Sequence, residues 1–318
     1  MLVLVIAACG SGNTNQAGEN NSPNNAAATN GTNAAEASNT PASESETVTY
    51  KAANGDIEIP KNPKRIALLA DYFGYFMQLG IKPVAVTNYS FQNPFFEGLL
   101  DGVENIGDGS DLEKIIAAQP DLIFTWDEKS VEQLEKIAPT ILIQYGALNY
   151  KDQLKEFGKI TGTEAKAEEW LASWDAKIAE AKPKLQESVG DKTISIIQTD
   201  GKNVYVFGDK FGRGGEILYQ ELGLNATPAT KKETIDQGPG YASISLEKLP
   251  EFAGDYIFGG AWTLENTADL LYDSAIWKEL PAVKANNVFE IHPIGFYFND
   301  PISLEKQLDF FLTNLVKE

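Results

Sequence analysis

The sequence predicts an α/β protein with two Rossmann-like lobes joined by a single long α-helix. Three observations support this fold class. Short apolar segments alternate with helical segments on both sides of residues 164–187, as they do in sheets of parallel strands connected by helices. Residues 164–187 have apolar side chains mostly at helical spacing. A stretch of 13 residues from the first half recurs in the second half.

The N-terminal lobe is expected over residues 47–163. Its short apolar runs are bounded by turn residues and indicate buried strands, whereas Gly80 and Pro120 mark the ends of helical segments. In chain order, the sequence predicts a strand at 66–69, a helix at 71–79, a strand at 84–87, a helix at 111–119, a strand at 122–124, a helix at 131–137 and a strand at 141–143.

The connecting helix is expected over residues 164–187, with Trp170, Trp174 and Ile178 on its apolar face. At 1.5 Å per residue it is about 35 Å long, which is the width of a domain. Thr163 is a suitable N-cap residue. Pro183 lacks an N–H group and is expected to kink or fray the last turn.

The C-terminal lobe is expected over residues 188–318, where the alternation resumes. The sequence predicts strands at 194–198, 204–207, 256–258 and 288–291, and helices at 215–222, 246–252 and 303–316.

The internal repeat relates residues 112–124 to residues 246–258. Six of the 13 aligned positions are identical, and no gap is needed. Each copy predicts a helix followed by a buried strand, so we expect two lobes of similar topology. Glu113 and Glu247 occupy equivalent positions near the start of a helix, and Ser110 with Glu113 matches the capping-box pattern.

The N-terminal residues indicate export and lipid attachment. Residues 2–8 are too short to span a bilayer, which needs about 20 apolar residues. They match the end of a secretory signal peptide, and Ile6-Ala7-Ala8-Cys9 resembles a lipobox whose cysteine carries the lipid. No basic segment precedes it, so we expect the true start to lie upstream. Residues 10–46 contain no aromatic or basic residue and are expected to be a disordered tether.

The composition excludes several classes of function. The 26 basic and 45 acidic residues give a net charge of −19, which disfavours nucleic acid and anionic lipid as partners. One Cys allows no internal disulfide, and one His excludes a His-rich metal site. A hydrolase triad could use only His292, and neither a G-x-S-x-G motif nor a phosphate-binding loop is present. No catalytic activity is therefore expected.

Several short motifs together resemble the class III periplasmic-type binding lipoproteins of ABC importers, in particular the iron-siderophore binders of Gram-positive bacteria. The motifs are Lys64-Arg65-Ile66, Leu79-Gly-Ile-Lys-Pro83, Asp121-Leu-Ile-Phe124, Phe211-Gly-Arg-Gly-Gly-Glu216 and Asp300-Pro-Ile-Ser303. The resemblance covers residues 48–318 and implies capture of an iron(III)-siderophore and its delivery to an ABC permease. Among siderophores it favours ferric hydroxamates such as ferrichrome or ferrioxamine. The siderophore itself would hold the iron, so no cofactor or protein-bound metal is expected.

The expected ligand site centres on Arg213. A ferric trihydroxamate presents hydrogen-bond acceptors and apolar chains, so its receptor needs a donor fork and aromatic walls. Arg213 supplies the fork, and the flanking glycines are expected to leave its side chain uncrowded at a helix start. Aromatic residues at strand ends and loops are the candidates for the walls, because open α/β sheets bind ligands there. The favoured ligand-binding residues are Phe211, Trp262, Tyr297, Trp126, Tyr89, Tyr205 and Phe91, with Phe296, Phe298, Asn88 and Asn93 as further candidates.

Other iron chelates with the same fold remain alternatives. A ferric catecholate carries a charge of about −3, and its receptors in this family look like they use clusters of Arg and Lys; a single Arg suits a neutral or cationic complex better. Citrate-type siderophores are a further possibility. Haem could in principle use His292 and Met77 as axial ligands, although both residues are more readily explained as structural.

The resemblance also assigns partners. In this family, one acid per lobe, here Glu113 and Glu247, looks like the docking contact for arginines on the permease. The same acids in a first helical turn would stabilise the helix dipole without any partner. We expect a monomer on the extracellular face of the cell membrane, held by the lipid on Cys9.

Overall fold

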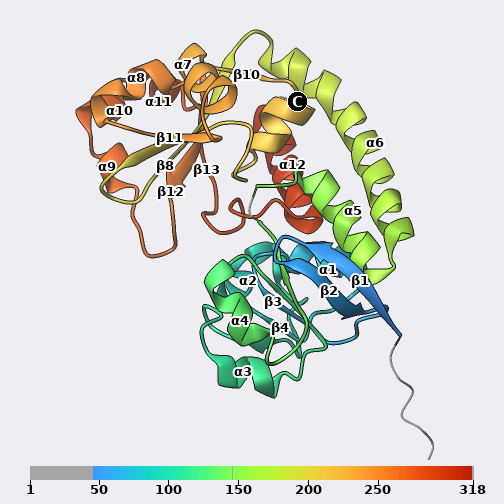
Figure 1. The fold of residues 1–318 in the computed structure, drawn as a ribbon. Coiled ribbons are helices and arrows are strands. Elements are labelled where there is room, and N and C mark those ends of the chain that lie inside the picture. The colour runs from blue at the N-terminus through green and yellow to red at the C-terminus, as the bar shows by residue number, and fades with distance from the viewer. Residues whose placement is uncertain (1–45, 145, 317–318) are drawn as a thin grey trace, which may run out of the picture. The chain divides into compact units, whose positions relative to one another are not determined.

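The structure is a computed structural model that describes residues 46–144 and 146–316. Within these residues, two α/β lobes are connected by helix α6 (Glu164–Val189), as Figure 1 shows. The predicted fold class is confirmed. The predicted signal-peptide remnant, Cys9 and the tether up to residue 45 lie outside the described residues.

The N-terminal lobe is built on a five-stranded parallel sheet. Its strand order is β5-β4-β3-β6-β7, and helices lie on both faces. The strands are β3 (Ile66–Leu69), β4 (Ala85–Val86), β5 (Glu104–Asn105), β6 (Leu122–Thr125) and β7 (Thr140–Leu142). The helices are α1 (Phe73–Gln78), α2 (Asn88–Gln92), η1 (Pro94–Phe96), α3 (Leu112–Ala117), η2 (Glu128–Ser130), α4 (Val131–Leu134) and α5 (Tyr150–Thr161). Helix α5 was not predicted, and α1, α3 and α4 are shorter than expected.

A hairpin of two antiparallel strands, β1 (Thr47–Ala52) and β2 (Gly55–Pro60), precedes this sheet and was also not predicted. Asn54 in its turn is bonded to edge strand β7. The amide of Asn54 donates to the carbonyl of Thr140 at 3.0 Å, and its Oδ1 accepts from the backbone N–H of Leu142 at 3.0 Å. The hairpin turn therefore satisfies backbone groups that an open sheet edge would leave exposed.

The C-terminal lobe contains a mixed six-stranded sheet. The strand order is β11-β9-β8-β12-β13, with β10 pairing β8. The strands are β8 (Thr193–Thr199), β9 (Val204–Phe207), β10 (Asn225–Ala226), β11 (Tyr241–Ile244), β12 (Tyr256–Ala261) and β13 (Val288–Glu290). The helices are η3 (Glu216–Glu221), α7 (Pro228–Thr230), η4 (Lys231–Asp236), η5 (Leu246–Lys248), α8 (Leu249–Phe252), α9 (Asp269–Tyr272), α10 (Ala275–Glu279), α11 (Pro281–Lys284) and α12 (Pro301–Leu315).

The internal repeat corresponds to a shared topology. In the first lobe β6 lies parallel between β3 and β7, and in the second lobe β12 lies parallel between β8 and β13. The lobes differ on the other side of the sheet, where β9 is antiparallel to both β8 and β11. The expected capping box is wrong, because Asp111 caps α3 and Ser110 bonds Asp108 instead.

Helix α6 has 26 residues and is about 39 Å long. It extends beyond Pro183, which lies on the exposed side, while Ala181, Leu185 and Val189 remain buried. This packing on both sides of the proline explains why the helix continues for six residues after it. Thr163 is the N-cap residue, but its side chain makes no capping bond; its hydroxyl bonds that of Thr161 at 2.8 Å.

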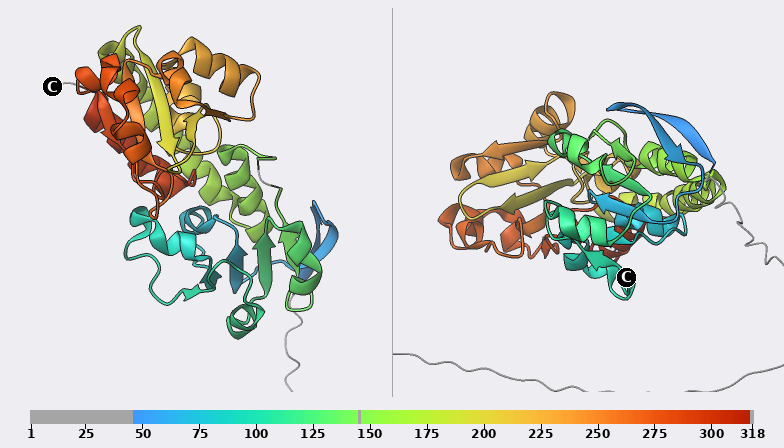
Figure 2. Two further views of the ribbon diagram at one scale, coloured as in Figure 1. Left: turned by 90° about the vertical axis from the view of Figure 1, so that its left-hand side faces the viewer. Right: turned by 60° about the horizontal axis from the view of Figure 1, so that its bottom comes forward.

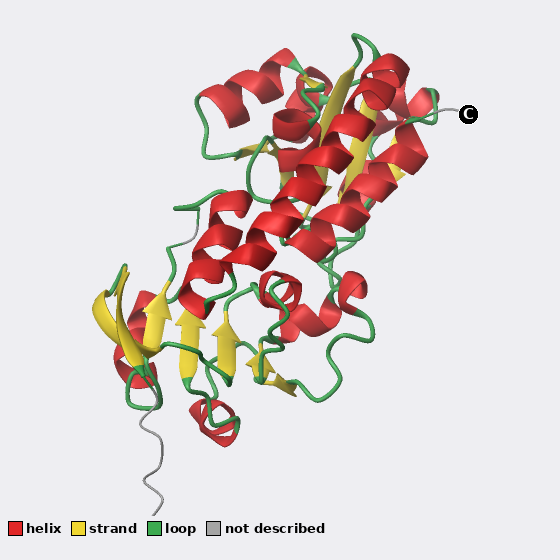
Figure 3. Cartoon of the chain, turned by 90° about the vertical axis from the view of Figure 1, so that its right-hand side faces the viewer, coloured by secondary structure: helices red, strands yellow, loops and turns green. Residues whose placement is uncertain are grey.

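The core continues from one lobe into the other. One hydrophobic cluster includes Phe76 and Phe157 of the first lobe, Trp174 of α6, and Phe258 and Phe311 of the second. Helix α12 packs against both α1 and α6, so the chain's last helix is shared by the two lobes rather than belonging to the second alone. Figure 2 shows the lobes at two ends of the molecule, and Figure 3 shows helices between the two sheets.

Candidate functional site

A cavity of about 490 Å³ lies among residues that are far apart in the sequence. Trp126 follows β6 of the first lobe, and the other lining residues come from the second half of the chain. Trp262 follows β12, so the two tryptophans that come just after the repeated strands line the same cavity. The complete lining is Trp126, Tyr205, Phe207, Phe211, Arg213, Tyr241, Trp262 and Tyr297.

Arg213 is held in the wall of this cavity by aromatic rings. Its guanidinium carbon lies 4.8 Å from the ring centroid of Phe207, 5.1 Å from that of Trp262 and 4.8 Å from that of Tyr297. Only 2% of the residue is exposed. A planar cation over aromatic faces gains electrostatic attraction, which is larger in a dry site. The wall therefore combines one delocalised positive charge with apolar rings.

Hydrogen bonds fix the orientation of the guanidinium. Its Nε donates to Oε1 of Gln198 at 3.1 Å, and its Nη1 donates to the carbonyl of Phe211 at 3.1 Å. Gln198 is itself oriented, because its Nε2 donates to the carbonyl of Ala261 at 2.9 Å. The side chain of Arg213 is therefore preorganised by the fold rather than left to find its position on ligand binding.

The loop that carries Arg213 has an unusual backbone. Four consecutive residues have positive φ: Phe211 (70°), Gly212 (69°), Arg213 (59°) and Gly214 (84°). This region is unfavourable for residues other than glycine, at a cost of roughly 1–2 kcal/mol each. The backbone N–H of Gly212 donates to Oε1 of Glu216 at 3.0 Å, and that of Arg213 to the carbonyl of Phe296, and these bonds stabilise the loop.

The glycines of this loop serve the backbone, which corrects the expectation that they leave the arginine side chain uncrowded. A Cβ on Gly212 would lie 2.3 Å from the carbonyl oxygen of Tyr297, and one on Gly214 would lie 2.4 Å from Cζ of Phe311. Other chain segments approach the loop too closely for any side chain at these positions. The helix after the loop, η3, is a π-helix, a form that is frequent at functional sites.

The aromatic walls pack against one another. The rings of Tyr205 and Trp262 are 4.3 Å apart at 70°, and those of Phe211 and Tyr241 are 5.1 Å apart at 72°. Both are edge-to-face arrangements, which aromatic pairs prefer. The hydroxyl of Tyr205 donates to Oδ2 of Asp200 at 3.2 Å. Several hydrogen bonds, the largest contribution coming from the side chain of Asn203, hold the pKa of the Asp200 carboxyl below its usual range.

Asp71 connects the first lobe to the cavity and was not predicted. Its carboxylate accepts hydrogen bonds from the hydroxyls of Tyr297 and, at 3.2 Å, Thr87. Burial raises the pKa of Asp71 to about 6, and the two hydrogen bonds oppose this effect. Because Asp71 lies just after β3, at the carboxyl edge of the sheet, its position could have indicated a site residue.

Six of the eight favoured ligand-binding residues line the cavity: Arg213, Phe211, Trp262, Tyr297, Trp126 and Tyr205. Tyr89 does not; its ring lies 5.6 Å from that of Tyr297. Phe91 lines a separate hollow with Pro94 and Leu100 on the first lobe.

The further candidates also lie elsewhere. Phe296 and Phe298 are buried in the core. Asn93 caps η1 and bonds Ser303, and Asn88 begins α2. None of the four lines the cavity.

Two lining residues, Phe207 and Tyr241, were missed by sequence reasoning. Phe207 follows Tyr205 by two positions on β9 and therefore shares its face of the strand, which the sequence could have indicated. Tyr241 begins the unpredicted strand β11 and is the direct partner of Phe207 in the antiparallel ladder.

The residues considered for haem do not line the cavity. Nδ1 of His292 accepts from the backbone N–H of Gly295 at 3.1 Å, and burial lowers the pKa of this imidazole. Met77 packs against the main core cluster. Over the described ranges, no three or more His, Cys, Asp or Glu side chains are grouped as a metal site would require.

Comparisons with known proteins agree with this architecture. Residues 66–294 match the family model described as periplasmic binding protein. The chain is 52% identical over 320 residues to the iron(3+)-hydroxamate-binding protein FhuD of Bacillus subtilis, covering 100% of this chain and 95% of that protein.

Solved structures give the same result. A FhuD-fold binding component of a ferrichrome ABC transporter from Bacillus subtilis has a TM-score of 0.81 and 56% identity, covering 85% of this chain and 100% of that one. FhuD2 of Staphylococcus aureus with bound ferrioxamine B has a TM-score of 0.74 and 32% identity, covering 80% and 98%. The chain therefore belongs to the periplasmic binding protein family, with the class III arrangement of two lobes joined by one long helix.

Proposed function

We propose that this protein captures a ferric hydroxamate siderophore and delivers it to an ABC permease. The observation that carries the proposal is the cavity in which Arg213 lies against three aromatic rings, in a chain 52% identical to an iron(3+)-hydroxamate-binding protein. Hydroxamate oxygens accept hydrogen bonds from a guanidinium, and the methylene chains of the ligand match aromatic walls.

The charge of the cavity supports hydroxamates over catecholates. Arg213 is the one basic residue among the eight that line it in the described part of the chain. A ferric trihydroxamate is neutral or singly positive, so a single guanidinium that mainly orients its oxygens is sufficient. A ferric catecholate, with a charge of about −3, requires more compensation when it leaves water.

Titration with a panel of ferric siderophores tests this assignment. Trp126 and Trp262 line the cavity, so their fluorescence reports occupancy by a ligand that absorbs or displaces solvent. Ferrichrome and ferrioxamine B are expected to quench it at far lower concentration than a ferric catecholate or ferric citrate. The metal-free ligands are the matched control. Tighter binding of the catecholate or of haem would contradict the proposal.

The protein is proposed to act by binding alone, without chemical change of the ligand. Recovery of intact ferrichrome after incubation with the protein and release by denaturation is the expected result. A modified ligand, or iron released as Fe(II), would contradict it.

Membrane attachment is proposed to occur through a lipid on Cys9, on the extracellular face. In residues 46–144 and 146–316, no helix is long and apolar enough to cross a bilayer. Cys9→Ala in the full precursor is expected to release the protein into the medium, because a thioether-linked lipid requires the thiol. Cys9→Ser should behave in the same way, and continued retention of either variant would refute the lipid anchor.

Glu113 and Glu247 are proposed to bind arginines on the permease. Both are exposed and occupy equivalent positions in the repeat, Glu113 in α3 and Glu247 in η5. Figure 1 shows α3 on an outer part of the first lobe, and α8, which directly follows η5, on an outer part of the second. Glu113→Ala with Glu247→Ala is expected to abolish uptake and leave ligand affinity unchanged. Glu168→Ala with Glu169→Ala removes the same charge from exposed positions of α6 and is the control. Equal loss of ligand binding would assign the acids another role.

We infer that the binding protein acts as a monomer. Sedimentation of the ligand-loaded protein is expected to give a single species at the mass of one chain, and a ligand-dependent dimer would contradict this.

A further inference from the structure

A second cavity, of about 260 Å³, lies next to the Arg213 cavity and is here called the side cavity. Phe211 lines both, so its side chain stands between them. The side cavity is bordered by residues around the start of α5 and by the loop before η3, among them Tyr75, Tyr150, Gln153, Asp209 and Glu216. The loop that positions Arg213 therefore also forms part of the wall of the side cavity.

Three buried polar atoms of the side-cavity residues have no hydrogen-bond partner among the described residues: Nε2 of Gln153, Oδ1 of Asp209 and Oε2 of Glu216. Gln153 and Glu216 are each only 6% exposed. A buried carboxylate oxygen without a partner is costly, by roughly 1–3 kcal/mol or more. The two carboxylate oxygens call for a hydrogen-bond donor, whereas the amide nitrogen of Gln153 calls for an acceptor.

Glu216 presents its two oxygens differently. Oε1 accepts from the backbone N–H of Gly212 at 3.0 Å and from Nδ2 of Asn299 at 3.3 Å. Oε2 has neither contact. Burial raises the pKa of Glu216, although the hydrogen bond from the backbone N–H of Gly212 and, to a smaller extent, the charge of Arg213 oppose this. A second cation on the side of Oε2 would stabilise the ionised form.

The charges and rings around the side cavity favour a cation. The charged residues that line it are two acids, Asp209 and Glu216, and one exposed base, Lys210. Aromatic rings of Tyr72, Tyr75, Tyr150 and Phe211 complete the wall and can receive an ammonium on their faces. The side cavity is large enough for several water molecules, and hence also for a short alkyl chain.

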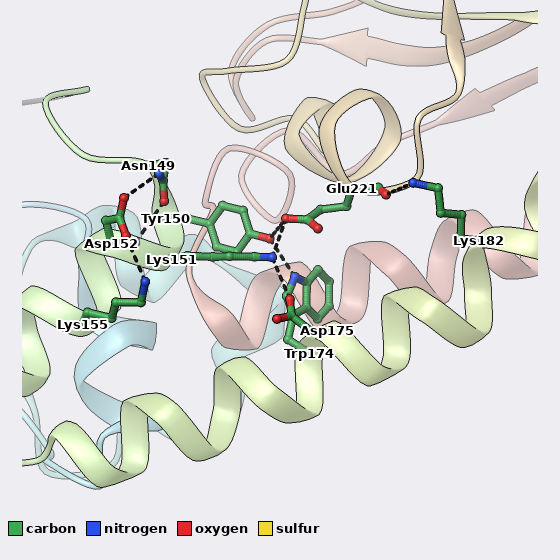
Figure 4. Close-up of polar contacts among 9 residues, drawn as sticks. All are labelled: Asn149, Tyr150, Lys151, Asp152, Lys155, Trp174, Asp175, Lys182 and Glu221. Carbon is green, nitrogen blue, oxygen red and sulfur yellow. Dashed lines mark hydrogen bonds and ion pairs between the residues drawn. The ribbon is translucent and has the colours of Figure 1, made fainter.

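The neighbouring acid Glu221 already has a cationic partner, Lys151, as Figure 4 shows. The hydroxyl of Tyr150 donates to Oε1 of Glu221, and Nζ of Lys151 lies 2.9 Å from the same oxygen and 2.7 Å from Oδ1 of Asp175. Nε1 of Trp174 donates to the hydroxyl of Tyr150 at 2.7 Å. These contacts fix the Tyr150 ring as a rigid wall of the side cavity, and Glu221 does not line that cavity.

We propose that the side cavity receives the ammonium arm of a linear ferric trihydroxamate whose iron centre occupies the Arg213 cavity, with Glu216 and Asp209 facing the ammonium. The inference rests on the proposed function and specifies the substrate class further. Linear hydroxamates that end in a primary amine, such as ferrioxamine B, would be preferred over those without one.

The test compares three ferric ligands on the full-length protein: ferrioxamine B, its N-acetylated form, and ferrichrome, which has no such arm. Acetylation is expected to weaken binding to the unmodified protein about tenfold, as for a lost charge-assisted hydrogen bond. In Glu216→Gln, whose amide oxygen can keep the bonds to Gly212 and Asn299, the difference between ferrioxamine B and its acetylated form should disappear. The affinity of each variant for ferrichrome, which lacks the arm, is the reference that accounts for any change in the Arg213 loop.

Two further variants keep the test decisive. The thermal midpoint shows whether Glu216→Gln folds. If it does not, Asp209→Asn takes its place in the test and should reduce the same difference. Glu233→Gln removes an equal charge from an exposed position of η4 in the same lobe, outside the side cavity, and should retain the full difference.

Equal binding of ferrioxamine B and its acetylated form by the unmodified protein would overturn the inference and leave the proposed function intact. Retention of the difference in both Glu216→Gln and Asp209→Asn would also overturn it, because the amine would then be recognised elsewhere. If none of the three ferric hydroxamates binds, the proposed function itself is wrong.

Discussion

Replacing Arg213 is expected to weaken ferric hydroxamate binding without unfolding the protein. Arg213→Ala removes the guanidinium that lies 4.8–5.1 Å from three rings of the cavity wall. A hydrogen bond from a charged donor to a ligand in a partly dry site is worth about 1.5–3 kcal/mol. The dissociation constant should therefore rise about 10- to 100-fold.

Arg213→Lys separates charge from geometry. Lysine keeps the positive charge but has one nitrogen, whereas the guanidinium bonds Gln198 and the carbonyl of Phe211 with two different nitrogens. A single ammonium cannot reproduce this planar fork or its contact with the rings. The affinity of the lysine variant is expected to lie between those of wild type and Arg213→Ala.

The assay is tryptophan quenching by ferrichrome and ferrioxamine B, together with a thermal midpoint for each variant. Truncation leaves Oε1 of Gln198 buried without its donor, which costs about 1–3 kcal/mol of stability. Titrations must therefore be made well below the midpoint of the least stable variant. A folded Arg213→Ala protein that binds both ligands as tightly as wild type would refute the role of this residue.

Three other predictions follow from the geometry. Trp262→Ala should weaken binding to a similar degree through lost apolar cover, and wild-type affinity would place the ligand elsewhere. Gly214→Ala should lower the thermal midpoint, because its Cβ would lie 2.4 Å from Phe311; an unchanged midpoint would contradict the observed packing. Burial raises the pKa of Asp300 to about 6, so between pH 4 and 6 the folded state binds the additional proton. The free energy of unfolding should therefore fall as pH rises through this window, and less steeply in Asp300→Asn; equal slopes would exclude Asp300 as the cause.

Much of the fold follows from local patterns in the sequence. The strands at 66–69 and 204–207 are found where the apolar runs predicted them. The connecting helix begins at Glu164 as expected. Helix α5 was missed although it begins at an Asn cap and ends at Gly162, which are recognisable signals. The short strand β11 has a mixed pattern of exposure and no strong signal of its own.

The sequence by itself determined the two-lobed α/β architecture and the position of the Arg213 loop, because hydrophobic periodicity, turn residues and the repeat are local properties of the chain. Only the tertiary structure decided that Tyr241 lies opposite Phe207, that Asp71 bonds Tyr297, and that the side cavity lies beside Phe211. These contacts join segments far apart in the sequence. Strand register and the close packing of α12 against both lobes set them, and neither is encoded in the residues of one segment alone.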